Sequence, residues 1–150
     1  MIWPGPKSPP EAAVPSLHIN AISAGDCAVL RLAGEMDVYT SPKLRKQVAD
    51  LAENGTIHVI ADLRGIEFLD STGLGALVGS LKRLRVRQGS LMVVTSGGRI
   101  LRLFQITGLT RAFALYRSVL DAISTDQDWQ EAIASEGRSA EEWCFKHELP

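Results

Sequence analysis

The chain lacks the features that mark several large classes of protein. Its 150 residues include only two cysteines, Cys27 and Cys144, too few for a disulfide framework or a cysteine-based metal site. No apolar run approaches the roughly 20 residues of a membrane span. Residues 1–15 also lack the apolar run of a secretion signal. These absences predict a cytoplasmic protein in a reducing compartment, with no membrane partner.

The distribution of charge argues against a nucleic-acid binder and sets the C-terminal segment apart. Residues 1–124 carry 14 Lys or Arg and 10 Asp or Glu, without the strong basic excess that nucleic acids attract. Residues 125–150 reverse the balance, with two Lys or Arg and seven Asp or Glu. We therefore expect no direct contact with nucleic acid and a C-terminal extension that differs chemically from the rest.

Composition and punctuation divide the chain into three parts. Residues 1–15 hold five of the seven prolines and are predicted to be disordered. With 45% apolar residues, the chain can bury one sizeable core, which we assign to a domain at 16–124. The acidic extension 125–150 is predicted to be helical, because Ser139 and Glu142 have the spacing of a capping box. Its aromatic residues Trp129, Trp143 and Phe145 favour packing against the chain's own domain over contact with a partner.

Strand and helix patterns alternate through the middle of the chain. Period-two alternation and short apolar runs predict strands over 17–23, 27–33, 57–63, 91–95 and 113–116. Apolar residues at helical spacing predict helices over 42–53, 71–88, 99–105 and about 119–123, the first capped by Ser41. The pattern predicts an α/β domain with a central mixed sheet, opened by an antiparallel hairpin and with helices mainly on one side.

The segment Asp70–Leu74 is the strongest candidate for a functional site. Asp70, Ser71 and Thr72 can each cap a helix, yet one helix start needs only one cap. Gly73 and Gly75 follow within the first turns, where each costs about 1 kcal/mol relative to alanine. We interpret these glycines as lowering the steric barrier around the hydroxyl, so that the backbone of another protein can approach.

Catalytic interpretations of this segment are weaker. A nucleophile elbow needs glycine two residues before and after the serine; Gly73 fits, but Leu69 occupies the earlier position. The glycines also miss the spacing of nucleotide-binding loops, and no clustered His, Cys or carboxylate set suggests a metal. The sequence therefore assigns no catalytic residue, cofactor or metal, and a serine hydrolase is the weakest alternative.

Four short motifs together resemble a known family. The runs Ile60–Leu63 and Phe68–Gly75 resemble the signature of STAS domains of the anti-sigma factor antagonist type. Gly34–Asp37 matches the G-E-x-D turn of that family, and Thr107–Leu109 resembles its later T-G-L turn. The motifs occur in the family's order over about residues 16–124, so the resemblance implies a STAS-type fold for this region.

The resemblance also implies a regulatory function. Members of this family bind an anti-sigma factor, often itself a serine kinase, and so release a sigma factor for transcription. The kinase modifies the serine that follows the motif's aspartate, which here is Ser71, and a phosphatase reverses the modification. Thr72 is the second choice of acceptor. A STAS module that is never phosphorylated is the main alternative.

The predicted docking surface combines two segments. By resemblance, Asp37, Tyr39 and Thr40 lie near the serine, although a turn with a helix cap explains them equally well. The full predicted surface consists of Asp37, Tyr39, Thr40, Asp70, Ser71, Thr72, Gly73 and Leu74. A basic set on the second helix, interpreted as a solvated face that attracts the acidic extension, consists of Lys82, Arg83, Arg85 and Arg87. The oligomeric state stays open, a homodimer included.

Overall fold

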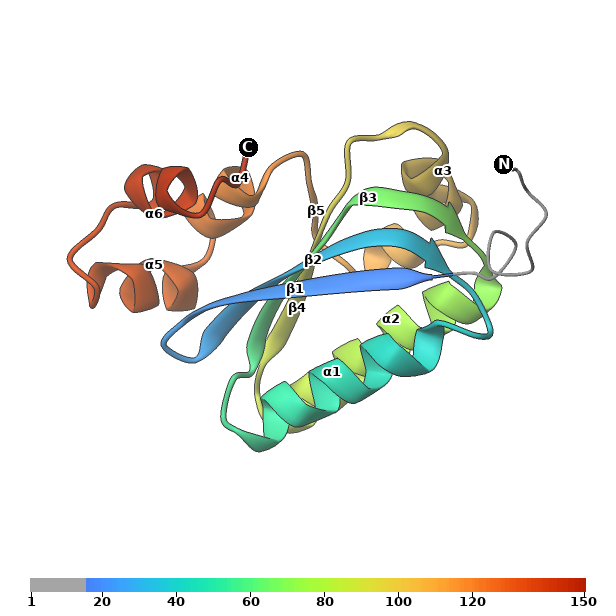
Figure 1. Ribbon diagram of the computed structural model, residues 1–150, viewed down its shortest axis with the longest axis horizontal. Helices are drawn as coiled ribbons and strands as arrows, with labels where there is room; N and C mark the ends of the chain where they lie inside the picture. The colour runs from blue at the N-terminus through green and yellow to red at the C-terminus, as the bar shows by residue number, and fades with distance from the viewer. Residues whose placement is uncertain (1–15) are drawn as a thin grey trace, which may run out of the picture.

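A computed structural model of the chain describes residues 16–150, and the predicted disorder of residues 1–15 lies outside the described residues (Figure 1). Five strands form one sheet in the order β1-β2-β3-β4-β5. They are β1 (Leu17–Ala24), β2 (Cys27–Met36), β3 (His58–Leu69), β4 (Ser90–Val94) and β5 (Leu115–Tyr116). β1 and β2 form the antiparallel hairpin, and all other pairs are parallel. The predicted mixed α/β sheet is therefore confirmed.

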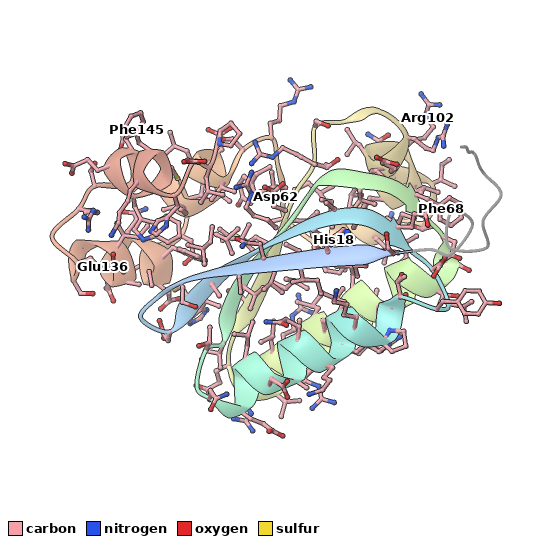
Figure 2. All side chains as sticks on the ribbon, viewed as in Figure 1. His18, Asp62, Phe68, Arg102, Glu136 and Phe145 are labelled. Atoms are coloured by element: carbon pink, nitrogen blue, oxygen red, sulfur yellow. The ribbon has the colours of Figure 1, made fainter. Side chains whose placement is uncertain are left out.

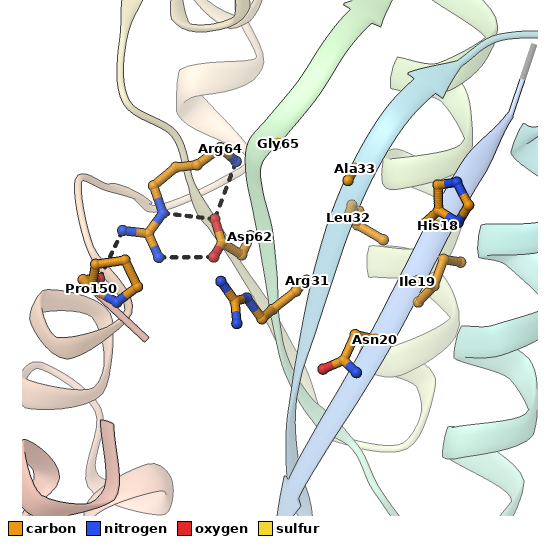
Figure 3. Close-up of a pocket in the computed structure, with 10 residues that line it drawn as sticks. All are labelled: His18, Ile19, Asn20, Arg31, Leu32, Ala33, Asp62, Arg64, Gly65 and Pro150. Carbon is orange, nitrogen blue, oxygen red and sulfur yellow. Dashed lines mark hydrogen bonds and ion pairs between the residues drawn. The ribbon is translucent and has the colours of Figure 1, made fainter. Parts of the chain in front are cut away.

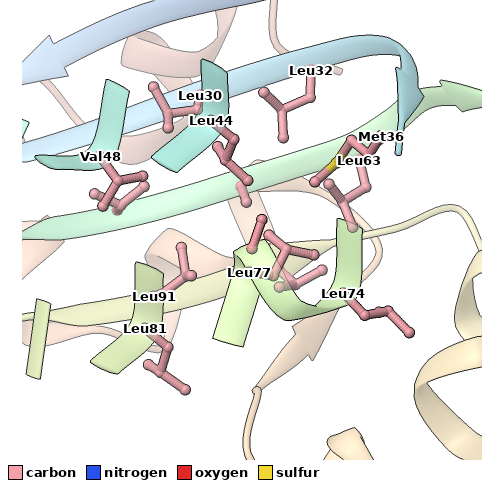
Figure 4. Close-up of a cluster of buried hydrophobic side chains, with 14 of the residues drawn as sticks. Leu30, Leu32, Met36, Leu44, Val48, Leu63, Leu74, Leu77, Leu81 and Leu91 are labelled. Carbon is pink, nitrogen blue, oxygen red and sulfur yellow. The ribbon is translucent and has the colours of Figure 1, made fainter. Parts of the chain in front are cut away.

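Helices α1 (Ser41–Glu53) and α2 (Ser71–Val86) pack side by side on one face of the sheet (Figure 1). Their apolar stripes meet the side chains that the strands direct to this face, because alternate residues of a strand point to opposite sides. The cluster between them includes Leu30, Leu44, Leu63, Leu77 and Leu91 (Figure 4). Helix α3 (Gly98–Ile106) adds Ile100 and Phe104 to the same cluster.

The C-terminal extension covers part of the opposite face. Its helices α5 (Gln127–Ala134) and α6 (Ala140–Lys146) lie together with α4 (Val119–Ser124), the last helix before the extension, and α5 contacts β1 and β2 (Figure 1). Trp129 and Trp143 are fully buried, with their rings in edge-on contact at 5.7 Å. They share a cluster with the strand residues Cys27, Ile60 and Met92. Packing of the extension on its own domain is thus confirmed for both tryptophans, whereas Phe145 is 87% exposed.

The sequence underestimated the length of two strands. β3 was predicted to end at Leu63 and instead continues to Leu69, paired with β2 as far as the contact between Met36 and Leu69. The first three residues of the expected G-E-x-D turn accordingly belong to β2, and the turn begins at Asp37. The polar residues in the added part of β3 are tolerated because they keep contact with water: Arg64 is half-buried and Glu67 is exposed.

The structure corrects one predicted helix cap and confirms another. Thr40, not Ser41, occupies the N-cap position of α1, and Ser41 is already the first helical residue. The Ser41 hydroxyl donates to the Asp37 carbonyl, so it anchors the preceding turn without capping the helix. The capping box of α6 is confirmed, because Ser139 and Glu142 exchange both side-chain hydrogen bonds at 3.1 and 2.9 Å.

Arg64 on β3 makes a polar contact with the extension. Arg64 binds both carboxylate oxygens of Asp62 at 2.9 and 2.8 Å and donates to the Pro150 carbonyl at 2.7 Å (Figure 3). These residues border a hollow on the uncovered face of β1, β2 and β3. On α2, Arg85 and Arg87 donate to the backbone carbonyls of Ala112 and Ala52, and the attraction of the basic set for the extension stays a prediction.

The burial of the two tryptophans predicts that the extension stabilises the whole domain. Replacing Trp143 with alanine should lower the free energy of unfolding by about 3–5 kcal/mol, since it empties a fully buried site. Phe145→Ala, on the same helix, should change it by less than about 0.5 kcal/mol, because that ring is in solvent. Urea unfolding followed by circular dichroism measures both. Equal effects of the two substitutions would contradict this packing.

Candidate functional site at the start of helix α2

Helix α2 begins directly where β3 ends, and Asp70 joins the two. The Asp70 carboxylate accepts a hydrogen bond from the backbone N–H of Gly73 at 3.0 Å, which makes Asp70 the N-cap. Its own N–H donates to the Met36 carbonyl at the end of β2, at 3.3 Å. Asp70 therefore holds the start of α2 against the end of the sheet at which β2 and β3 terminate.

The cap on Asp70 leaves the two following hydroxyl residues free. Ser71 and Thr72 are both exposed, and within residues 16–150 neither side chain makes a hydrogen bond. Both lie in the first turn of a 16-residue helix, where unpaired N–H groups and the helix dipole favour negative charge. The site can thus hold an added anionic group on either hydroxyl without breaking a contact of the fold.

Gly73 and Leu74 are structural, which corrects two members of the predicted docking surface. A Cβ atom on Gly73 would lie 2.6 Å from both the Met36 carbonyl oxygen and Leu69 Cδ1. Gly73 is therefore required for the approach of α2 to the chain's own sheet, and our interpretation that it admits a partner is wrong. Leu74 is only 6% exposed and packs in the core. Gly75 is under no such constraint, because a Cβ there would meet nothing nearer than Arg45 at 3.8 Å.

The turn after β2 is held by its own polar side chains. Asp37 Oδ1 accepts hydrogen bonds from the backbone N–H groups of Tyr39 and Thr40, at 2.9 and 3.0 Å. Thr40 is 8% exposed, and its hydroxyl donates to the Glu35 carbonyl at 2.7 Å. Asp37 and Thr40 thus shape the turn, while the Tyr39 ring is 79% exposed.

Two more exposed apolar residues lie at this end of the sheet, and the sequence did not single them out. Val38 is 59% exposed beside Tyr39 in the turn, and Phe68 is 46% exposed near the end of β3 (Figure 2). Phe68 pairs in register with Glu35, so strand pairing brings the turn and the end of β3 to the same end of the sheet as Ser71. We call Val38, Tyr39 and Phe68 the apolar rim. The sequence feature that could have identified them is a large apolar side chain at the end of a strand or directly after it.

Other chemically active groups lie elsewhere or are held inactive. Burial and the neighbouring Asp26 carboxylate raise the pKa of the Cys27 thiol, and burial raises that of Cys144, so both thiols stay protonated at neutral pH. In residues 16–150, no hydrogen bond joins a histidine to Ser71, and no group of three or more His, Cys, Asp or Glu is placed to hold a metal. Among the described helices, none has the length and apolarity to cross a membrane.

The comparison with known proteins establishes the family. A model of the STAS domain matches residues 18–122, so the chain belongs to the STAS domain family. The anti-sigma-B factor antagonist of Staphylococcus epidermidis is 39% identical over 94 residues, covering 63% of this chain and 87% of the relative. The Staphylococcus aureus protein of the same name is 36% identical with the same coverage.

A solved structure supports the fold directly. The crystal structure of an anti-sigma factor antagonist from Mycobacterium paratuberculosis has a TM-score of 0.67 and is 28% identical to the chain. The match covers 73% of this chain and 93% of that one. The resemblance that the four short motifs indicated is therefore confirmed, as is the STAS-type α/β fold.

The contrasting surroundings of two glycines in α2 predict opposite effects of the same substitution. Gly73→Ala should lower the free energy of unfolding by about 1–3 kcal/mol, because the new methyl group overlaps Met36 and Leu69. Gly75→Ala should raise it by up to about 1 kcal/mol, because alanine is the better helix former and the space is open. Chemical denaturation tests both. A stabilising Gly73→Ala would contradict the close approach of α2 to β2.

Proposed function

We propose that this protein is an anti-sigma factor antagonist that binds an anti-sigma factor with serine kinase activity and is switched off by phosphorylation of Ser71. The observation that carries the proposal is the free, exposed hydroxyl of Ser71 beside a helix cap made entirely by Asp70. The names of the two staphylococcal relatives support the same function. Such regulators are binding proteins, and the proposal assigns Ser71 as the substrate of another enzyme.

The apolar rim supplies the docking surface in this proposal. Exposed apolar side chains that lie together on a soluble protein mark interaction sites, because water contact disfavours them. Val38 and Tyr39 project from the turn after β2, and Phe68 lies on the adjoining strand. Ser71 and Thr72 follow the same strand end, so a partner seated on the rim covers the hydroxyl to be modified.

The switch acts by local charge. A phosphate adds about −1.5 to −2 charges at pH 7. The start of α2 tolerates that charge within the free protein, since the helix dipole is positive there. In the complex, the same charge stands beside the Asp70 carboxylate and must be stripped of water at the apolar rim, which costs binding free energy. Phosphorylation therefore blocks docking while the domain stays folded, and a phosphatase restores binding.

The proposal also predicts the compartment in which the protein acts and the cofactors that it needs. Its partners, a regulator of sigma factors and a kinase that uses ATP, place the protein in the cytoplasm. It needs no metal or cofactor on this chain, because the transferred phosphoryl group and its magnesium belong to the kinase. The alternative, a STAS module that is never phosphorylated, shares the docking surface and differs only in the chemistry at Ser71.

The assignment of the acceptor is tested by phosphorylation in vitro. The protein is incubated with its cognate anti-sigma factor and ATP, and the modified residue is located by mass spectrometry. We expect one phosphate on the wild type and on Thr72→Ala, and none on Ser71→Ala. Phosphate on Ser71→Ala but not on Thr72→Ala would assign the second acceptor instead. No phosphate on the wild type, with binding intact, would support the unmodified module.

The docking surface is tested by affinity capture from the source cells. Wild type and Ser71→Ala should each recover an anti-sigma factor, identified by mass spectrometry. Ser71→Asp should recover at least tenfold less, because it places a charge at the same position. Tyr39→Ala should also lose binding, whereas Phe145→Ala, which removes an equally exposed ring on α6, should not. Equal recovery by Ser71→Asp and wild type would contradict the proposed switch.

A further inference from the structure

β1 forms an open edge of the sheet. It has eight residues and, within residues 16–150, one neighbouring strand, β2, because it stands first in the strand order. The Ser16 carbonyl accepts a hydrogen bond from the Glu35 N–H at 2.8 Å, so Ser16 and Glu35 form a hydrogen-bonded antiparallel pair. Such pairs alternate along an antiparallel ladder. The backbone groups of Ile19, Ala21 and Ser23 therefore point away from β2, toward solvent.

An independent contact supports this direction. The Leu17 carbonyl, which has the same parity as Ile19, accepts a hydrogen bond from Lys43 Nζ on α1 and so also points away from β2. Beyond that contact, no hydrogen bond of the described residues uses the outward backbone groups of Ile19, Ala21 or Ser23. The backbone N–H and C=O groups of these three alternate residues are therefore unpaired within the described chain, and they are spaced to pair with another strand.

This edge lacks the devices that usually protect exposed strands. Natural edge strands carry charged residues, prolines or bulges, or are very short. β1 carries no Asp, Glu, Lys, Arg or Pro, and its register with β2 runs without a shift from Leu17 to Ala24. The opposite edge, β5, has only two residues and so cannot extend the sheet far. β1 is therefore the edge suited to strand addition.

We propose that a second copy of this chain adds to the sheet by antiparallel pairing of β1 with β1, about a two-fold axis at Ala21. In this register Ala21 faces itself and Ile19 faces Ser23, so the outward donors and acceptors satisfy one another through about six hydrogen bonds. Two identical β1 strands can pair without like-charge repulsion, because the strand carries no charged residue. Small and exposed, Ala21 allows close approach at the axis.

The geometry leaves both candidate functional sites free. The start of β1 pairs with Gly34 near the end of β2, which is the end that carries Ser71. Antiparallel pairing of two β1 strands points these ends in opposite directions. The dimer is therefore bivalent, with one apolar rim at each end of a continuous sheet. Because a three-residue edge buries little apolar surface, we expect an equilibrium that depends on concentration.

Sedimentation velocity over a wide range of protein concentration tests the interface. The wild type should shift from monomer to dimer as concentration rises. Ala21→Lys should stay monomeric at concentrations where the wild type is dimeric, since two lysines would face each other across the axis. Ala134→Lys, which adds the same charge at an exposed alanine of α5, should dimerise like the wild type. Circular dichroism confirms that each variant is folded.

A charge-reversal mixture separates the interface from a general loss of stability. Ala21→Glu alone should be monomeric, and an equal mixture of Ala21→Lys and Ala21→Glu should recover the dimer, because opposite charges then meet at the axis. A wild type that is monomeric throughout would overturn the proposal. So would an Ala21→Lys protein that dimerises like the wild type, or a mixture that stays monomeric. None of these outcomes depends on the proposed function.

Discussion

The close approach of the first turn of α2 to the end of β2 is the constraint on which the site depends. Gly73 has no side chain to hold the helix away from the Met36 carbonyl, and Asp70 donates its N–H to that same carbonyl. The helix is therefore seated directly on the sheet edge. A side chain at position 73 would overlap Met36 and Leu69, so the first turn of α2 would have to move away from the sheet.

Because α2 begins so close to the sheet, neighbouring residues there have different roles. Asp70 uses its carboxylate as the cap, so the hydroxyls of Ser71 and Thr72 have no structural task within the described residues. On the adjoining strand end, Asp37 and Thr40 hold the turn from inside and leave Tyr39 exposed. Polar groups that make structural hydrogen bonds thus lie next to exposed groups that remain available to a partner. This difference in roles explains why a charge added at Ser71 changes the surface and not the fold.

Much of this arrangement could be predicted from local patterns. The hairpin, the buried strand at 57–63 and the capping box at Ser139 depend on neighbours in sequence, which a single chain displays. The same holds for the excess of cap-competent residues at 70–72. The resemblance then identified Ser71 from motifs that are individually short, and the family match confirmed their joint meaning.

The remainder depends on contacts between segments distant in sequence. Nothing local shows that Gly73 faces Met36, so the sequence alone does not reveal the packing role of this glycine. Arg64 and Glu67 have the polarity of a loop and lie at the two shifts in the register of β3 with β2, so only the pairing of their neighbours keeps them within a strand. Phe68 belongs to one of the family motifs, but its exposure follows only from the position of its strand end in the fold (Figure 2). The side of the sheet on which the C-terminal extension packs was likewise not encoded in any local pattern.

The central claim is that phosphorylation at Ser71 abolishes docking without altering the fold. The most direct measurement applies far-UV circular dichroism, thermal unfolding and calorimetric titration with the anti-sigma factor to one sample of stoichiometrically phosphorylated protein. The account predicts a spectrum and cooperative unfolding transition like those of the unmodified protein, together with loss of binding. A phosphorylated protein that loses helical signal, or that stays folded and still binds with unchanged affinity, would contradict it.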